Sequence, residues 1–285
     1  MTVTVERHAV PVVDEQLTGR LAEQFETTIR NLDASPAIIA RAMNEALLQV
    51  QVHQALNPRA NRFGTWDATV CAMQVGTAAF AAASVTEGSF ETRIAHEMRT
   101  ISATGPQSHA NAGNWLTTLW FVIVCRDQPR MDAMCRLPLG LLRASGAEDD
   151  DAYVHHWVDA LQTYWHEQPG LLEKLTRAIE QSHPDIATNA PRDLLQCVLY
   201  PPINLFHQFL RKDEDGFNRA LAEALELHRA YWSAPERAGD IAGFLALGPL
   251  AIACLAYDAG LEIEVESDYL PLRLLDRSWL GEFDT

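Results

Sequence analysis

The chain has 285 residues, 48% of them hydrophobic, which is ample apolar material for one large core or two fused halves. It contains 22 Lys and Arg against 38 Asp and Glu, so its formal net charge is −16. A surface this acidic repels phosphate backbones and anionic lipids, so we expect no binding to nucleic acid or to a membrane; solubility or a basic protein partner accounts for the charge better.

An extended arm at residues 1–13 precedes a first half that is dominated by helical periodicity. Apolar residues recur three and four positions apart, the spacing of one helix face, in the ranges 14–32, 36–57, 66–85 and 111–126. Ser35-Pro36 is a typical N-cap and first helical residue for the second of these helices. The third is rich in Ala and apolar on most sides, which predicts a central position. Residues 91–99 predict a short amphipathic turn or helix before a break at Gly105-Pro106.

The second half continues the pattern in shorter segments. Helical spacing recurs in the ranges 137–143, 152–167, 171–181, 192–200, 203–212, 215–232, 241–259 and 269–275. Pro201-Pro202 predicts a joint between two of these helices. Residues 261–265 alternate apolar and acidic side chains, which predicts one short extended segment near the C-terminus. Together the elements predict an all-α, multi-helical fold in a single domain spanning residues 1–285, either globular or weakly solenoidal with packed helical hairpins.

Three further features bear on cellular location. The longest apolar stretches, 115–125 and 243–257, are shorter than the roughly 18 to 20 residues of a membrane span. The N-terminal arm lacks the basic segment and apolar core of a secretory signal. The five cysteines are widely spaced and lie mostly in apolar helical contexts, which favours buried free thiols in a reducing compartment. We therefore expect a cytoplasmic protein.

The sequence contains no complete catalytic or metal-binding motif. His96-Glu97 and His166-Glu167 each begin like the zinc sequence H-E-x-x-H, but neither is followed by a second histidine one turn later. There is no C-x-x-C pair, no glycine-rich phosphate loop and no G-x-S-x-G elbow. We therefore expect neither a bound metal nor a cofactor.

Two acidic segments are candidates for a partner-binding surface. They contain Glu148, Asp149, Asp150 and Asp151 in the first segment and Glu262, Glu264, Glu266 and Asp268 in the second. The first precedes a predicted helix, whose dipole favours carboxylates at that end without any ligand. In the second, an extended backbone would turn the apolar residues toward the core and the carboxylates toward water in one row. Such a row is suited to steering a basic partner.

Other polar residues are candidates for a ligand pocket. They are Arg93, His96, Arg99, His109, Asn111 and Asn114 in one cluster, His155, His156 and Asp159 in a second, and Asn204 and His207 after the proline pair. The first cluster is equally typical of an internal hydrogen-bond network that braces the break at Gly105-Pro106. His155 and Asp159 lie one helical turn apart and could form an acid–base pair, although their aromatic surroundings are more typical of a core or an interface.

Five strings spread along the chain carry a family resemblance. They are WDATVCAMQVGTAAFAAAS (66–84), RIAHEMRTISATGPQSHANAGNW (93–115), HHWVDALQTYW (155–165), YPPINLF (200–206) and LGPLAIACLAYDAGLEIEVESDYL (247–270). Together they resemble the immunity 49 family of bacterial toxin-neutralising proteins, over almost the whole chain. The last string is the most specific.

The resemblance implies an all-α immunity protein that is encoded beside a secreted or polymorphic toxin and binds this cognate toxin in the cytoplasm without catalysis. It implies no catalytic residues. The acidity of the chain suits a basic toxin. Two alternatives stay open at this point: a helical small-molecule enzyme of secondary metabolism with a pocket at one of the polar clusters, and a helical scaffold similar to tetratricopeptide proteins. An adjacent toxin gene would favour the first reading, and a biosynthetic gene cluster would favour the enzyme.

Overall fold

The computed structural model describes residues 2–9, 15–33, 35–146 and 150–285. Its α-helices are α1 (Glu15–Arg30), α2 (Ile39–Leu56), α3 (Phe63–Ser84), α4 (Ala112–Cys125), α5 (Gln128–Cys135), α6 (Leu139–Ser145), α7 (Ala152–Trp165), α8 (Leu171–Gln181), α9 (Arg192–Leu194), α10 (Pro201–Arg211), α11 (Glu214–Trp232), α12 (Leu247–Asp258) and α13 (Leu272–Leu275). The strands are β1 (Val3–Thr4), β2 (Ser89–Ile94), β3 (Glu97–Ser102) and β4 (Val265–Glu266). The predicted all-α class is therefore confirmed.

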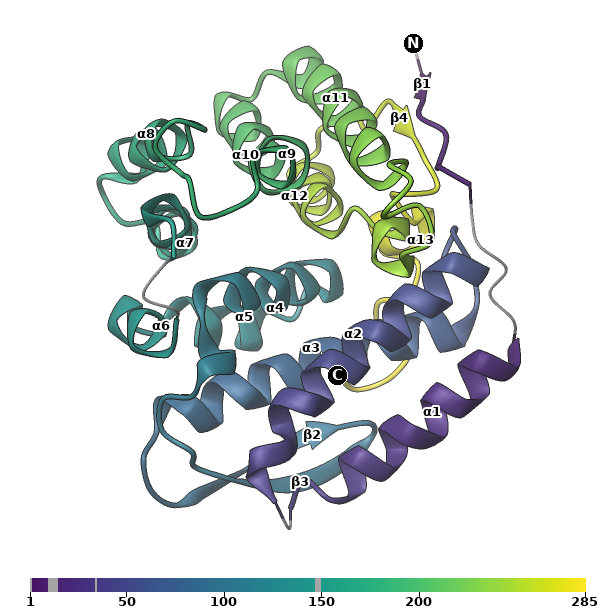
Figure 1. Cartoon of the computed structure of the whole chain (residues 1–285), viewed down its shortest axis with the longest axis vertical. Helices are drawn as coiled ribbons and strands as arrows, with labels where there is room; N and C mark the ends of the chain where they lie inside the picture. Colours follow the sequence, from purple (N-terminus) through teal and green to yellow (C-terminus); the bar gives the residue numbers. More distant parts are fainter. Residues whose placement is uncertain (1, 10–14, 34, 147–149) are drawn as a thin grey trace.

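The helices close on themselves instead of forming an open solenoid (Figure 1). Neighbouring helices pack in pairs, such as α2 with α3, α7 with α8 and α10 with α11, as the predicted hairpins require. However, α12 returns to pack against both α4 and α10, and β1 pairs in parallel with β4. A solenoid repeat would contact only its neighbours in sequence. One continuous cluster of buried apolar residues extends from Val5 to Leu275, so the chain forms a single domain.

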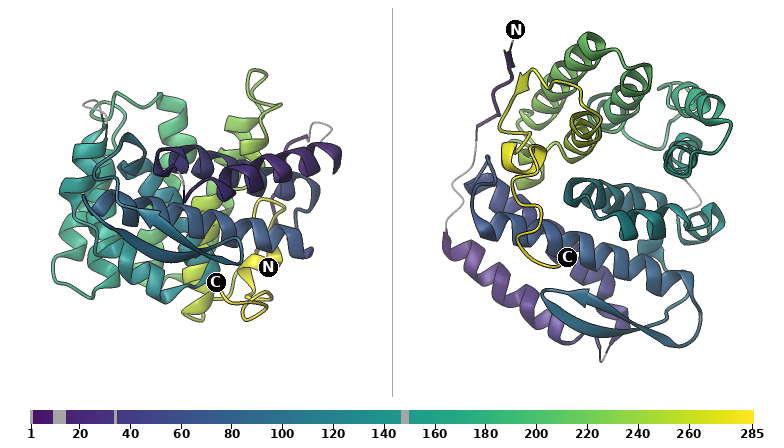
Figure 2. Two further views of the ribbon diagram at one scale, coloured as in Figure 1. Left: turned by 90° about the horizontal axis from the view of Figure 1, so that it is seen from below. Right: turned by 180° about the vertical axis from the view of Figure 1, so that it is seen from behind.

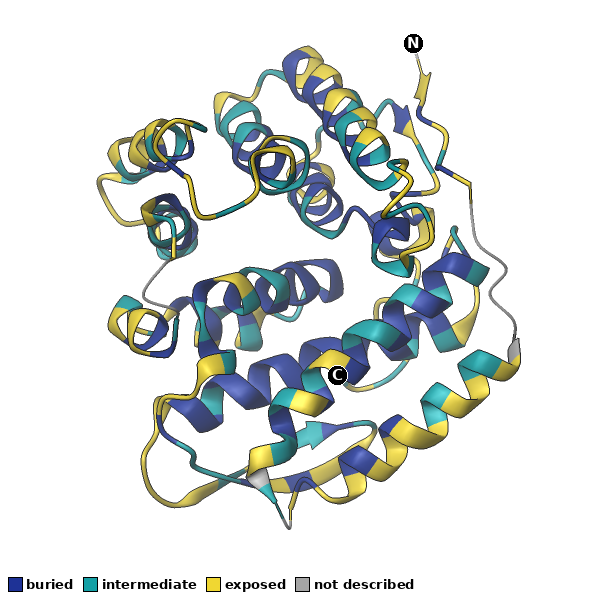
Figure 3. Cartoon of the chain, in the orientation of Figure 1, coloured by how far each residue is buried: buried dark blue, intermediate teal, exposed yellow. Residues whose placement is uncertain are grey.

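The Ala-rich helix α3 lies at the centre, as its composition predicts. Most of its residues are buried (Figure 3). Gly76 brings α3 close to α4, because a Cβ at this position would lie 2.7 Å from Oγ1 and 2.8 Å from Cγ2 of Thr118. Small residues in α3 thus allow a close approach between two helices of the core.

Replacing Gly76 should therefore destabilise the fold. We expect Gly76→Ala to lower the free energy of unfolding by about 1–3 kcal/mol, because the added methyl overpacks the contact with Thr118. Gly19→Ala in exposed α1, where a Cβ meets no atom within 4 Å, should raise it by up to about 1 kcal/mol through helix propensity. Urea denaturation of both variants measures the two effects. Effects of the same sign would contradict this account of the α3–α4 contact.

The segment expected to form a turn or helix at 91–99 is instead a β-hairpin. Strands β2 and β3 pair antiparallel, with Ile94 opposite Glu97, and Figure 2 shows them across α3 beside α1. The two turn residues, Ala95 and His96, have positive φ angles of 51° and 66°. Tight two-residue hairpins require this conformation and usually place Asn-Gly there. The prediction was wrong because Ala-His lacks that signal.

Several other boundaries also differ from the prediction. Helix α5 was not expected, and the range predicted as one helix at 241–259 is a 3-10 turn (Ile241–Phe244) separated from α12 by extended Leu245. Ser35 does not cap α2 directly; its carbonyl oxygen accepts from Ile38 in an intervening 3-10 turn. The proline pair makes no break, because a π-helix (Leu195–Leu199) leads through Tyr200 into α10. Proline needs no N–H partner in a first turn.

Two expectations about buried segments can be compared with the fold. The apolar stretch expected at 243–257 was judged too short to cross a membrane. In the structure, the segment Ile241–Asp258 is long and apolar enough to do so by length and composition alone. However, 61% of it is buried in the structure, and the core helix of a soluble protein passes the same test. All five cysteines are free, and four are buried, as predicted. Burial raises the pKa of the Cys254 thiol to about 12.

Candidate functional site

The second acidic segment forms a rigid row of carboxylates, called here the acidic edge (Glu262, Glu264, Glu266 and Asp268). On one side, Val3 and Val5 of the N-terminal arm donate their N–H groups to the carbonyls of Glu264 and Glu266 at 2.8 and 3.0 Å. On the other side, Asn218 of α11 donates to the carbonyl of Glu262 and accepts from the N–H of Glu264, both at 2.8 Å. The backbone of the edge is therefore held from both sides.

The side chains of the acidic edge alternate largely as expected. Val265 is buried, whereas Glu262, Glu266 and Asp268 are exposed and Glu264 is partly buried. Strand β4 is short, so only the end of the predicted extended segment belongs to a sheet. The nearby cation, Arg7, is directed inward: it donates to the carbonyls of Gln54 and Ala55 and lies over the ring of Phe244. The carboxylates of Glu262, Glu266 and Asp268 are thus presented to water.

The first acidic segment has a structural role where it is described. Asp151 accepts backbone N–H groups from Thr188, Asn189 and Ala190 at 2.9–3.2 Å, which ties the start of α7 to the loop after α8. Asp150 lies 3.9 Å from Nε2 of His155. Glu148 and Asp149 lie outside the described residues. Helix α7 and strand β4 lie on opposite sides of the molecule (Figures 1 and 2), so the two acidic segments do not form one surface.

The predicted polar cluster before α4 is divided by the structure. Asn114 donates its side-chain amide to the carbonyl of His109 at 2.8 Å, and Asn111 caps α4 by accepting from the N–H of Asn114. These contacts brace the connection from the hairpin to α4, as the structural interpretation predicts. Arg93 lies on β2 and donates to the carbonyl of His96. Of the residues in this predicted cluster, His96 and Arg99 line the cavity described below.

The predicted acid–base pair on α7 does not form. Asp159 accepts from Nζ of Lys174 on α8 at 2.8 Å, and the same ammonium group donates to Thr163. His155 faces Asp150 instead, and burial lowers the pKa of its imidazole. His156 is partly exposed, as is Asn204 on α10. The predicted helix places His155 and Asp159 one turn apart, but Lys174 of α8 pairs with the Asp159 carboxylate instead.

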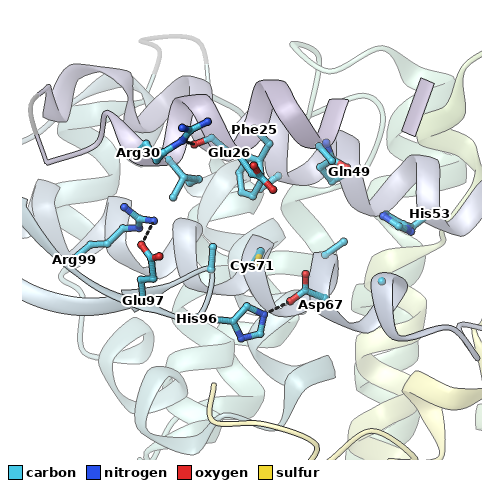
Figure 4. A pocket seen from close by; sticks show the side chains of 16 residues that line it. Phe25, Glu26, Arg30, Gln49, His53, Asp67, Cys71, His96, Glu97 and Arg99 are labelled. Carbon is cyan, nitrogen blue, oxygen red and sulfur yellow. Dashed lines mark hydrogen bonds and ion pairs between the residues drawn. The ribbon is translucent and has the colours of Figure 1, made fainter. Parts of the chain in front are cut away.

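A cavity of about 500 Å³ lies between α1, α2, α3 and the β-hairpin (Figure 4). Its main polar groups come from three elements: Gln49 and His53 from α2, Asp67 from α3, and His96, Glu97 and Arg99 from the hairpin. The floor is apolar and contains Phe25, Ile29, Ala46, Ala68 and Cys71.

The polar groups of this cavity form one histidine–carboxylate hydrogen bond and one ion pair. Nε2 of His96 lies 2.7 Å from Oδ1 of Asp67, and the ring of Phe283 contacts the same imidazole edge-on at 4.7 Å. Nη2 of Arg99 lies 2.8 Å from Oε2 of Glu97. Burial raises the pKa of the Cys71 thiol, so it stays protonated and is a poor nucleophile. The arrangement supplies hydrogen-bonding groups and charge around an apolar floor.

Sequence reasoning missed most of this cavity. Gln49 and His53 are polar residues one turn apart on α2, and this interruption of its apolar face was the available signal. Asp67 meets His96 only because the hairpin folds back across α3. In the part of the chain that the structure describes, no group of three His, Cys, Asp or Glu side chains is placed to hold a metal ion.

The fold and these sites define the class: a single-domain, all-α protein with an acidic edge and a polar cavity. A family model described as Immunity protein 49 matches residues 57–274, more than half of the chain, so the chain belongs to this family. The acidic edge lies inside the matched range, whereas the α1 and α2 residues of the cavity precede it. Membership indicates an immunity role in general. No curated protein and no solved structure matches the chain.

Proposed function

We propose that this protein binds a cognate bacterial toxin in the cytoplasm and neutralises it by occluding its active site, without a chemical step of its own. The observation that carries the proposal is the family match over residues 57–274, which includes the acidic edge. The net charge of −16 supports a basic protein as the partner over nucleic acid or a membrane.

The acidic edge is the surface that we assign to this partner. Its backbone is fixed by Asn218 on one side and by the N-terminal arm on the other, so little ordering is needed on binding. The carboxylate of Glu214, which accepts from the N–H of Glu262 at 3.1 Å, adds a further negative charge beside it. Like charges in a row contribute little to folding, but they steer a basic partner during encounter.

Removing charge from this edge should slow association with the toxin. We expect the triple variant Glu262→Gln, Glu264→Gln and Glu266→Gln to associate about tenfold or more slowly at low salt, because charged surfaces act mainly on the association rate. The difference should shrink near physiological salt, where the Debye length is about 8 Å. Surface-binding kinetics across ionic strength, with the product of the adjacent toxin gene, measures this effect.

A matched control has the same change in net charge elsewhere. The triple variant Glu87→Gln, Glu173→Gln and Glu180→Gln removes three exposed carboxylates from other surfaces. It should associate at nearly the wild-type rate, and thermal melting should show both variants folded. Equal slowing by the two triple variants would show that only the overall charge matters, and the acidic edge would then not be the docking surface.

A further inference from the structure

Gln49 is a polar side chain that lines the cavity between α1, α2, α3 and the hairpin. The residue is only 5% exposed, and its side chain hydrogen-bonds to no other residue in the described part of the chain. Its amide opens onto the cavity, as Figure 4 shows. The Gln49 amide is therefore available to hydrogen-bond to a group that enters the cavity, both as a donor and as an acceptor.

His53 provides a second polar group beside Gln49. Burial lowers the pKa of its imidazole, so the ring is neutral near pH 7 and has one donor and one acceptor nitrogen. Gly64 allows the ring its position, because a Cβ at residue 64 would lie 3.0 Å from Cε1 of His53. This end of the cavity therefore recognises a hydroxyl or a similar uncharged group.

Arg99 gives the cavity its charge preference. The Arg99 side chain is 10% exposed, compared with 33% for Asp67 and 70% for Glu97, so a cation is the most buried of these charges. Its Nη2 and Nε donate to Glu97 and to the carbonyl of Ile94, which leaves Nη1 without a partner among the described residues. Arg30 of α1 lies toward the same end in Figure 4. A guanidinium with a free N–H favours a carboxylate.

Apolar side chains line the middle of the cavity, and the exposed Glu26 of α1 lies at its edge. Phe25 and Ile29 of α1 face Ala68 and Cys71 of α3, and all four are buried. The volume of about 500 Å³ lies within the range of about 300–1,000 Å³ that is common for small-molecule sites. The protonated Cys71 thiol adds no charge to this floor.

We propose that this cavity binds a small organic acid, with its carboxylate at Arg99, its apolar body over Phe25 and Cys71, and a hydrogen-bonding group at Gln49 and His53. This site is separate from the acidic edge and independent of toxin binding. The ligand class follows from the free Nη1 of Arg99 at one end, the apolar side chains of the middle and the amide at the far end.

The test measures binding of two probe acids to the full chain by isothermal titration calorimetry. The probes are 4-hydroxyphenylacetate and hexanoate, and 2-(4-hydroxyphenyl)ethanol serves as the uncharged control. We expect saturable one-to-one binding of at least one acid, at least tenfold tighter than the alcohol. Arg99→Met should weaken it about tenfold or more. Ala68→Leu, which fills the cavity without touching Arg99, should abolish it.

Two matched variants on α2 separate binding from folding. Gln49→Leu should weaken binding of the hydroxylated acid about fivefold or more without lowering the melting temperature, because the amide supports no contact in the fold. Gln54→Leu also removes a buried amide without a partner, but Gln54 does not line the cavity, so binding should be unchanged. Absence of saturable binding of both acids up to about 5 millimolar, or equal binding by the Ala68→Leu variant, would overturn the proposal.

Discussion

The variant Arg126→Ala is expected to lose about 3–5 kcal/mol of the free energy of unfolding, because it leaves buried polar partners unsatisfied. Arg126 follows α4, and its side chain is 11% exposed. Its guanidinium donates to the carbonyls of Val124, Leu274 and Leu275 and pairs with Asp258 of α12 at 3.1 Å. One side chain therefore joins the end of α4 to α12 and α13, which are more than 100 residues away in the sequence.

Arg277→Ala is the matched control, because Arg277 pairs with the same carboxylate. Nε of Arg277 lies 2.6 Å from Oδ1 of Asp258, but its side chain is 44% exposed. Exposed pairs contribute roughly 0–1 kcal/mol. Urea denaturation should therefore separate the two variants by about 2 kcal/mol or more. Similar losses would show that the exposed pair, and not the buried set of carbonyl contacts, stabilises this junction.

Acid should destabilise the protein through His228. This imidazole is buried, and its Nε2 lies 2.8 Å from the carbonyl oxygen of Gly243. Burial lowers its pKa from 6.5 to about 4. Because the folded pKa lies below the unfolded value, the neutral ring stabilises the fold above about pH 6.5, and this stability is lost as the pH falls toward 4. The shift corresponds to up to about 3 kcal/mol.

Urea denaturation between pH 7.5 and pH 4.5 measures this effect, and two variants identify its source. His228→Leu should be less stable at pH 7.5, because it leaves the carbonyl of Gly243 unpaired, but its stability should change less with pH. His183→Gln removes an exposed histidine and should keep the wild-type slope. Burial also lowers the pKa of His8, so a smaller slope remains in His228→Leu. A wild-type slope in His228→Leu would assign the acid sensitivity elsewhere.

Local patterns predicted the helices well where turn residues and apolar spacing agree. Helix α8 has the predicted bounds, since Gly170 adopts a positive φ immediately before it and an amphipathic pattern follows. The hairpin was not predictable in the same way, because Ala95 and His96 adopt positive φ without glycine or asparagine. The hairpin packs against α3, and this tertiary contact cannot be predicted from the spacing of residues in the sequence.

The sites depend more strongly on long-range contacts. The alternation at 261–265 predicts exposed carboxylates, but its partner strand at Val3–Thr4 comes from the opposite end of the chain. The pairing of Asp159 with Lys174 likewise depends on α8 folding back along α7. His96 and Arg99 were predicted as pocket residues, whereas Gln49 and His53 were interpreted only as part of a helix. The spacing of residues identifies the faces of a single helix or strand. The cavity forms only where α1, α2, α3 and the hairpin meet, so it could not be predicted from spacing alone.

The most direct test of toxin neutralisation is a titration of a candidate toxin, chosen from the products of neighbouring genes, with this protein, with residual toxin activity and complex size measured on the same samples. We expect activity to fall linearly and to vanish at one equivalent, with a one-to-one complex in size-exclusion chromatography. This result follows from occlusion without catalysis. Full toxin activity in the presence of excess protein, with no complex, would contradict binding. Complete inactivation by a small fraction of an equivalent would contradict a stoichiometric mechanism.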